Sequence, residues 1–530
     1  MLADLRGLES GQVLEADVCV IGAGAAGITL ASELSATNRS VVVLESGGLE
    51  FEKDIQSLYS GTNVHPYFSL TTSRFRMLGG TTYVWGGWCA PLDEIDFRPR
   101  DWVPHSGWPI TRQDLLPFYR RAQRYCELGP YRYDISQWPV AAEHALQLDP
   151  AKLTHRMWQL STPTRFGSVY LDALRNARNV TVMLHATVVE ILTDASAMQV
   201  QNVRVADLSG REATVRAGVY VIACGGIETA RLLLASNGIE SAGLGNRFDV
   251  LGRYFMEHPH PDAGGVLLSG DAASLRAYPV TTVGQERVVV GIGPSADAQA
   301  RFRILNSSVA IAESLHRDPT DAWASLMKLS RAFQEGRWPD SAGSHIFNIL
   351  RDLDDVIHEA YLRSASREVR GFYLTARSEV APNPNNRVTL DHERDALGMQ
   401  RVRLNWNVSS LDRDSVATTM RLLAEELGRL GVGRLRVNEL LFEQDGRWCE
   451  NLSWFGHHMG TTRMSSDPKH GVVDSDCRVH GLANLYVASS SVFPTAGFAN
   501  PTLTILALAL RLADHIKQVA LPRLGRSVAP

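Results

Sequence analysis

A glycine-rich stretch near the start of the chain limits the possible folds more than any other feature. The apolar run at residues 18–21 (VCVI) predicts a buried strand, and Gly22, Gly24 and Gly27 follow it with the spacing G-x-G-x-x-G. Residues 28–35 (ITLASELS) then have the apolar spacing of a helix. A strand, a glycine turn and a helix in this order predict the nucleotide-binding unit of a doubly wound, Rossmann-type α/β fold.

The nucleotide site predicted by this unit includes a second strand. Residues 41–44 (VVVL) form another buried run, which ends at Glu45, about twenty residues after the glycines. A carboxylate at this position can accept hydrogen bonds from ribose hydroxyls, and the open helix start favours a pyrophosphate. We expect the flanking Ala25, Ala26 and Ser46 to line the same site. The pattern leaves NAD and FAD both open.

Composition and charge narrow the class of protein. A chain of 530 residues that is 45% hydrophobic can bury a large core in two or three domains. Its net charge is −4 and it has no basic block, which argues against a nucleic-acid partner. The first residues have no apolar signal region, and the late apolar run at 505–510 is far shorter than the ~20 residues that cross a bilayer. These features predict a cytoplasmic protein without a membrane segment.

The cysteines and paired histidines give no metal pattern. The six cysteines are scattered, without a C-x-x-C pair, and are expected to be reduced thiols. His258 and His260 stand in a His-Pro-His-Pro sequence, but no cysteine or carboxylate follows with a ligand spacing. We therefore expect no metal site and interpret both histidines as structural.

Residues 73–92 (SRFRMLGGTTYVWGGWCAPL) combine glycines with aromatic side chains and cannot form one regular helix or strand. Such a segment is either a tight surface turn or a stretch of backbone that passes close to a flat ligand. Because Trp85 and Trp88 are costly to expose, the second interpretation is favoured. The residues expected to contact a cofactor here are Gly80, Thr81, Val84, Trp85, Gly86 and Gly87.

A returning strand predicts another wall of the cofactor site. Residues 179–192 predict two strands, and residues 204–226 predict a meander with turns at Ser209–Gly210 and Ala217–Gly218. The meander ends in an apolar strand, a glycine turn and a helix. Glycines at the carboxyl end of such a strand are typical of the ligand crevice in a doubly wound fold. The expected cofactor contacts are Val188, Ala223, Cys224 and Gly225.

The sequence divides into two expected domains of different character. Residues 256–449 have longer polar loops, strand-like runs, and amphipathic helices around 320–335 and 411–430, which predicts an α+β substrate domain built on an antiparallel sheet. The expected assignment is residues 1–100, 155–255 and 450–530 to a discontinuous dinucleotide-binding domain, and residues 101–154 and 256–449 to the substrate-binding domain.

The C-terminal region carries a histidine and a helix start that suit redox chemistry. His457 precedes Gly460–Thr461, and Asn500-Pro501-Thr502 opens an apolar helix. Proline suits the first turn of a helix, and the positive helix end would stabilise the negative charge of a reduced flavin. This segment therefore favours a flavin over a nicotinamide dinucleotide.

Taken together, these motifs resemble the glucose–methanol–choline (GMC) family of flavin oxidoreductases. The matching segments run in order along the chain: GAGAAG with Glu45, LGGTTYVWGG, VIACGGIETARLLLAS, LGRYFMEHP, PNPNNRVTL, HHMGTTRM and SVFPTAGFANPTLT. The segments GGWCAPLDEIDFRPRDWVPHSGWPI and SSSVFPTAGFANPTLTILALALRLADH are similar to the pyranose-oxidase-like, glycoside 3-oxidase and sugar dehydrogenase members. The resemblance implies a glutathione-reductase-like FAD domain.

The resemblance assigns roles to individual residues. His457 matches the family's catalytic histidine, which is separated from the Gly-Thr pair by two residues, and Asn500 matches the second active-site residue. Ser489 stands where an acid is more common, so its contact with the cofactor is a weaker expectation. Val84 stands four residues after Gly80, where some relatives carry a histidine that binds the flavin covalently. Valine cannot form that bond, which predicts non-covalent FAD.

The implied reaction is the oxidation of a secondary alcohol of a sugar or glycoside to a ketone. His457 would take the hydroxyl proton, Asn500 would hold the oxygen, and flavin N5 would accept the hydride. The electron acceptor would be O2, a quinone or a redox protein. Three alternatives stay open: oxidation of a non-sugar alcohol, a lyase that retains its flavin, and a non-catalytic flavin-binding or assembly protein. A disulfide reductase would need a redox cysteine pair and a second dinucleotide fingerprint, and the sequence has neither.

Overall fold

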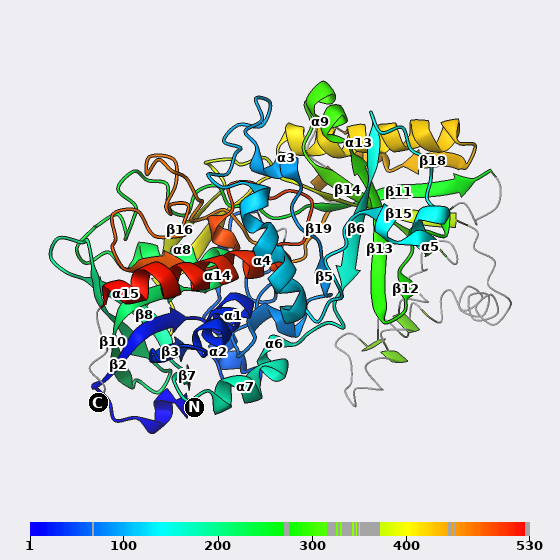
Figure 1. The fold of residues 1–530 in the computed structure, drawn as a ribbon. Helices are drawn as coiled ribbons and strands as arrows, with labels where there is room; N and C mark the ends of the chain where they lie inside the picture. The colour runs from blue at the N-terminus through cyan, green and yellow to red at the C-terminus, as the bar shows by residue number, and fades with distance from the viewer. Residues whose placement is uncertain are drawn as a thin grey trace.

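The structure is a computed structural model that describes residues 1–65, 68–269, 275–314, 371–443 and 452–524, with a few residues between these ranges. Figure 1 shows two large sheets at opposite ends of the molecule, and the N-terminus lies at the end that holds the first sheet. A smaller, three-stranded sheet joins β16, β17 and β4 (Arg387–Arg394, Gln400–Asn405, Gly61–Asn63).

The first sheet is the predicted nucleotide-binding sheet. Its order is β1-β7-β3-β2-β10-β9-β8, and β20 also pairs with β10. The strands from β1 to β10 along this order, together with β20, pair in parallel, whereas β8, β9 and β10 form an antiparallel meander. The strands are β1 Leu2–Asp4, β2 Gln12–Ile21, β3 Val41–Leu44, β7 Val180–Leu184, β8 Thr187–Thr193, β9 Val200–Ala206, β10 Glu212–Ile222 and β20 Leu485–Val487.

The strand β10 corrects one sequence prediction. The turn at Ser209–Gly210 exists, but no turn interrupts the chain at Ala217–Gly218, because β10 is continuous from Glu212 to Ile222. One edge of β10 pairs with β2 over nearly its whole length, and its other edge pairs first with β9 and then with β20. Pairing with β2 continues on both sides of Gly218, at Ala217 and Val219, and keeps this glycine in an extended strand although its sequence favours a turn.

The second sheet is antiparallel and lies at the other end of the molecule. Its order is β18-β11-β15-β14-β13-β6-β5, with β12 on β13 and β19 on β11. The helix α13 (Ser410–Arg429) lies along it, as Figure 1 shows, and confirms the helix predicted around 411–430. Of the helix predicted around 320–335, the structure describes only residues 325, 326, 329 and 330, and these are helical. The strands are β5 Trp88–Cys89, β6 Leu153–Leu160, β11 His260–Leu268, β12 Thr281–Val283, β13 Glu286–Pro294, β14 Ser307–Ser314, β15 Gly371–Ser378, β18 Gly433–Val437 and β19 Leu452–Ser453.

Helices cover the first sheet and connect the two halves. The C-terminal helix α14 packs beside α1 and α4, and its apolar face is buried with theirs in one continuous core. The helices are α1 Ala25–Leu34, α2 Lys53–Ser57, α3 Glu94–Phe97, α4 Arg112–Tyr125, α5 Pro139–Glu143, α6 Phe166–Val169, α7 Leu171–Asn176, α8 Gly225–Ala235, α9 Ala296–Phe302, α14 Thr502–His515 and α15 Leu521–Arg523.

The two halves exchange segments of chain. The strands β5 and β6 fall largely in ranges expected for the FAD domain but pair within the second sheet, whereas α4 falls in a substrate-domain range and packs against α14. The chain therefore crosses between the two sheets several times. This crossing places residues from distant parts of the sequence around one central cavity.

Candidate active site

A cavity of about 1020 Å³ lies between the two large sheets. Almost every residue that the sequence indicated as a cofactor or catalytic contact lines it, although these residues come from both ends of the chain. They are Gly22, Gly24, Ala25, Ala26, Glu45, Ser46, Gly80, Thr81, Val84, Trp85, Gly86, Gly87, Val188, Ala223, Cys224, Gly225, His457, Ser489, Asn500, Pro501 and Thr502. Gly27, which was also predicted as a cofactor contact, does not line the cavity.

The glycines of the fingerprint have different roles in the structure. A Cβ atom added to Gly27 would lie 1.9 Å from the carbonyl oxygen of Gly22, so Gly27 allows the helix α1 to pack on the turn. Gly22 has φ +101° and lies against Ala223. Gly24, in contrast, lines the cavity, and a Cβ atom added to it would meet no atom within 4 Å. A phosphate group fits this space, because Gly24 is the N-cap residue of α1 and no side chain caps the N–H groups of the first turn.

Glu45 is fixed at the end of β3 by two backbone contacts. Its carboxylate accepts hydrogen bonds from the N–H groups of Ala23, at 2.9 Å, and Gly47, at 3.0 Å. Burial raises the pKa of Glu45, and these hydrogen bonds oppose the shift. Each carboxylate oxygen keeps a second lone pair, so the group can still accept a hydrogen bond from a ribose hydroxyl.

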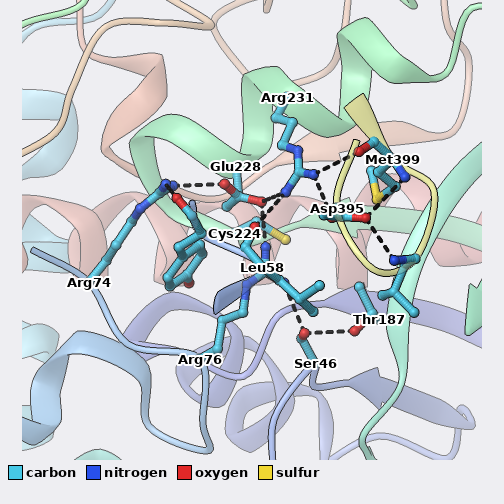
Figure 2. A network of polar contacts seen from close by, with 12 residues as sticks. Ser46, Leu58, Arg74, Arg76, Thr187, Cys224, Glu228, Arg231, Asp395 and Met399 are labelled. Carbon is cyan, nitrogen blue, oxygen red and sulfur yellow. Dashed lines mark hydrogen bonds and ion pairs between the residues drawn. The ribbon is translucent and has the colours of Figure 1, made fainter. Parts of the chain in front are cut away.

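A buried network of charged side chains forms the cavity wall beside Glu45 (Figure 2). Glu228 on α8 pairs with Arg74, Arg76 and Arg231, at 2.8, 2.5 and 3.1 Å respectively. Burial would raise the pKa of Glu228, but the three arginines lower it to about 2. Arg231 also pairs with Asp395.

This network reaches the nucleotide site directly. Arg76 donates to the hydroxyl of Ser46 at 2.9 Å, and Ser46 in turn contacts Thr187 at 2.7 Å (Figure 2). The sequence analysis did not identify Arg74, Arg76 or Glu228 as site residues. Three arginines with two carboxylates leave the network itself with a surplus positive charge, which suits a phosphorylated cofactor.

The glycine-rich segment at residues 79–88 borders the cavity as irregular backbone. Gly79 and Gly80 both have positive φ, and a Cβ atom at Gly80 would lie 3.3 Å from the Cα of Gly24. The segment therefore packs on the fingerprint turn. The indole of Trp85 donates to the carbonyl of Thr164 at 2.8 Å, and Val84 is 51% exposed.

The start of α14 and the segment before it form another side of the cavity. The helix begins after Asn500-Pro501 without a side-chain cap, so its free N–H groups and positive dipole end lie at the cavity wall. Ser489 contacts the hydroxyl of Ser491 at 2.6 Å and accepts from its backbone N–H at 2.9 Å. The serine hydroxyl therefore shapes the turn after β20.

His457 and Asn500 meet inside the cavity as the sequence indicated. The Nε2 atom of His457 lies 3.3 Å from Nδ2 of Asn500. On the other side of the ring, Nδ1 of His457 lies 3.0 Å from Nδ1 of His258, and Nε2 of His258 lies 2.9 Å from the carbonyl oxygen of Gly497. The sequence analysis took His258 as a structural residue, and its contact with His457 was not foreseen.

These contacts determine which nitrogen of His457 carries the proton. A carbonyl oxygen only accepts, so Nε2 of His258 must be the donor to Gly497. A neutral His258 then has a free lone pair on Nδ1, which accepts the proton on Nδ1 of His457. Nε2 of His457 is consequently left as an acceptor that faces Asn500 and the cavity.

Burial keeps both histidines neutral. It lowers the pKa of His258 to about 3, with a further contribution from the charge of Arg377. Burial likewise lowers the pKa of His457 well below its usual value, and neighbouring His258 and Arg377 add to this shift. The ring of His457 is therefore an uncharged proton acceptor around neutral pH.

The adjacent His458 has different surroundings. Its ring stacks on Phe68 and packs on Phe255, and its Nε2 atom lies 3.6 Å from a carboxylate oxygen of Glu257. Burial lowers the pKa of His458 to about 3 and raises the pKa of Glu257 to about 8. His458 thus packs mainly in an aromatic environment, whereas His457 contacts the asparagine.

The sequence analysis also missed Arg377 on β15. Its side chain lines the cavity, donates from Nη1 to Oδ1 of Asn500 at 2.9 Å, and lies over the rings of Trp88 and Trp158. Burial lowers the pKa of Arg377 to about 10. No motif marks this residue, because β15 comes next to the site only through long-range strand pairing.

Comparison with known families identifies the cofactor chemistry. The family described as FAD dependent oxidoreductase matches residues 17–333, more than half of the chain, and the family described as GMC oxidoreductase matches residues 382–509. The chain belongs to the GMC oxidoreductases. The first of these matches shows that the chain is an FAD-dependent enzyme.

Individual relatives agree with this assignment. The chain is 24% identical to the fructose dehydrogenase large subunit of Gluconobacter japonicus, over 96% of this chain and 98% of that protein. It is 39% identical to a C-glycoside 3-oxidase of Microbacterium trichothecenolyticum, over 24% of this chain and 23% of that enzyme. The crystal structure of pyridoxine 4-oxidase from Mesorbium loti has the same fold, with a TM-score of 0.59, 17% identity, and coverage of 94% of this chain and 99% of that one. In the described part of this GMC enzyme, no helix has the length and apolar character required to span a membrane.

Proposed function

We propose that this GMC oxidoreductase oxidises a secondary ring alcohol of a sugar or glycoside to a ketone. The observation that carries the proposal is the pairing of an acceptor, Nε2 of His457, with a donor, Nδ2 of Asn500, at the cavity surface. An alcohol oxygen placed beside both atoms can give its proton to one and receive a hydrogen bond from the other.

The chain's own residues account for the proton transfer. Nε2 of His457 takes the hydroxyl proton, while the Asn500 amide holds the oxygen and stabilises the negative charge that develops on it. His258 keeps His457 in the required tautomer. The hydride leaves the carbon that bears this hydroxyl, and bound FAD would supply its acceptor. Loss of the proton and the hydride converts the C–O bond of the alcohol into C=O.

The proposed cofactor contacts follow from the walls of the cavity. Gly22, Gly24 and the start of α1 hold the pyrophosphate, and Glu45 holds the ribose. The start of α14 has no side-chain cap, so its positive end would stabilise the negative charge of a bound, reduced flavin. We propose non-covalent binding, because Val84 cannot form a bond to the flavin.

The substrate class rests on the relatives and on the residues that line the cavity. The names of the relatives include a fructose dehydrogenase and a C-glycoside 3-oxidase. Phe68, Trp85 and Trp88 line the cavity and could stack on a sugar face, whereas Tyr67 lies outside the described residues. We also propose that O2, a quinone or a redox protein reoxidises the flavin.

The proposal has a direct chemical test. Purified enzyme is mixed anaerobically with D-glucose, D-fructose, methyl β-D-glucopyranoside, an aryl C-glucoside, ethanol and benzyl alcohol, and the flavin absorbance is followed. Bleaching by a sugar or glycoside, with a keto-sugar as product, is the expected result. If only the simple alcohols reduced the flavin, the sugar assignment would be wrong. Turnover of a substrate without any bleaching would favour the lyase alternative.

A further inference from the structure

Arg377 stands out among the cavity residues because its charge has no role in the proton transfer described above. It extends from β15 of the second sheet to the start of α14, and so bridges the two halves of the molecule at the active site. Its guanidinium lies 5.1 Å from the centre of the Trp88 ring and 5.3 Å from that of Trp158. These aromatic faces partly compensate the cost of burying the charge and fix the position of the group.

The contact between Arg377 and Asn500 determines how the amide is turned. A guanidinium has donors only, so the atom of Asn500 that faces it must be the oxygen Oδ1. The Nδ2 atom then has to point in the other direction, toward Nε2 of His457. If the amide were reversed, two donors would face each other at Arg377.

Two hydrogen-bonded chains therefore meet at the proposed position of the substrate oxygen. One runs from the Gly497 carbonyl through His258 to His457 and ends in an acceptor, Nε2. The other runs from Arg377 to Asn500 and ends in a donor, Nδ2. An alcohol oxygen needs one acceptor for its proton and one donor for its lone pair, and the two chains provide one of each.

We propose that Arg377 is a positioning residue for alcohol oxidation, which fixes the Asn500 amide so that its NH2 group binds the substrate oxygen beside His457. This inference rests on the proposed function, since it assumes that the alcohol binds between these two side chains. Arg377 acts on the amide, so at a pH where His457 is uncharged in every variant, removing Arg377 weakens the chemical step only while Asn500 is present.

The charge of Arg377 has a second effect, on His457. The charged or titratable groups that face His457 are His258, His260, His458 and Arg377. Burial lowers the pKa of His457 most, and Arg377 is the fixed positive charge that adds to the shift. An uncharged side chain at position 377 thus raises the pKa of His457. The base then becomes protonated at a higher pH, and the acid limb of the rate profile moves upward in pH.

The kinetic test uses a double-mutant cycle. Flavin reduction is measured by anaerobic stopped flow, with whichever of D-glucose, D-fructose or methyl β-D-glucopyranoside reduces the wild-type holoenzyme. Arg377→Met is expected to slow reduction about tenfold or more, with unchanged FAD content. At a pH above the acid limb, Arg377→Met/Asn500→Ala should match Asn500→Ala alone within about twofold. The acid limb of the rate profile should move to higher pH in Arg377→Met but not in Arg377→Lys. Independent, multiplied losses with an unchanged pH profile would overturn the proposal.

Arg463 provides a matched control for the loss of a buried arginine. It donates to the carbonyl of His105 at 2.7 Å, lies over the ring of Tyr254, and does not line the cavity. Burial lowers its pKa to about 10, as for Arg377. The folded fraction of Arg463→Met should reduce its flavin at the wild-type rate. If Arg463→Met slowed flavin reduction as much as Arg377→Met, the slower rate would be a general consequence of removing a buried arginine.

A second measurement needs no substrate and separates this inference from the proposed function. Crystal structures of the wild-type and Arg377→Met holoenzymes are compared at a resolution that distinguishes the amide nitrogen from oxygen. Asn500 should have one orientation in the wild type, with Oδ1 toward Arg377, and more than one orientation in the variant. A single, unchanged Asn500 in the variant would overturn the positioning role. If no sugar or glycoside of the panel given above reduced the wild-type flavin, the proposed sugar oxidation would fail, while this comparison would still decide the role of Arg377.

Discussion

The Nδ1 atoms of His457 and His258 lie 3.0 Å apart, and only one of them can carry a proton when both rings are neutral. The bond from His258 to the Gly497 carbonyl places the shared proton on His457. A histidine from the loop before β11 thus decides which nitrogen of the proposed base faces the cavity.

This relationship predicts the effect of His258→Leu. Without the acceptor on His258, the ring of His457 can take the other tautomer, in which Nε2 carries a proton and cannot accept one from an alcohol. Flavin reduction should slow by at least about tenfold, as expected when general-base catalysis is impaired, with FAD content unchanged. His260→Leu is the control: His260 packs on Phe455 and on the His457 ring but makes no hydrogen bond to it. Equal losses in the two variants would contradict the tautomer argument.

The glycines of the fingerprint should separate cofactor binding from folding. Gly24→Val projects bulk into the open cavity and should yield folded protein that has lost FAD, measured as the ratio of flavin to protein absorbance. Gly27→Ala places a methyl group against the Gly22 carbonyl and should lower the thermal unfolding temperature. Glu45→Arg should also lose FAD. A fully yellow, active Gly24→Val enzyme would mean that the nucleotide lies elsewhere.

Non-covalent attachment of the cofactor has a simple test. Acid precipitation or boiling of the holoenzyme should release all of the yellow chromophore into the supernatant as FAD, because Val84 offers no atom for a bond. Flavin that stayed with the denatured polypeptide would reveal another attachment residue.

Glu257 predicts a pH-dependent difference in stability. Burial raises the pKa of Glu257 to about 8 in the folded protein, above the usual value of about 4.3, so the folded state binds more protons than the unfolded state between these two pH values. Its contribution to the free energy of unfolding is therefore favourable at low pH and is lost as pH rises toward 8. Glu257→Gln removes this dependence. The unfolding temperature of Glu257→Gln minus that of the wild type should therefore increase from pH 5 to pH 8. A difference that does not change with pH would contradict the raised pKa of Glu257.

Local sequence patterns predicted the parts of the site that lie on regular elements. The run of residues 18–21, the glycines after it and Glu45 are neighbours in the chain, so their geometry follows from the strand, turn and helix that they form. The predicted pair His457 and Asn500 also came together, since α14 packs beside α1 and brings the C-terminal segment to the cavity.

The residues that sequence reasoning missed depend on contacts between distant segments. Arg377 reaches Asn500 only because β15 pairs between β11 and β14, and an isolated arginine in a strand gives no local signal of that pairing. His258 was interpreted as structural because its neighbours lack metal-ligand spacing. That criterion does not detect a hydrogen bond to another histidine. The false turn at Ala217–Gly218 has the same origin, because pairing with the distant strand β2 on both sides of the glycine overrides its local preference.

The most direct test of the account compares His457→Ala with His458→Ala in anaerobic flavin reduction by the sugar or glycoside that reduces the wild type. His457→Ala should bind FAD normally but reduce it at least about a hundredfold more slowly, as expected for loss of a general base. His458→Ala should change the rate far less, because that ring packs against Phe68 and Phe255. A near wild-type rate for His457→Ala, or the larger loss for His458→Ala, would contradict the assignment of the base.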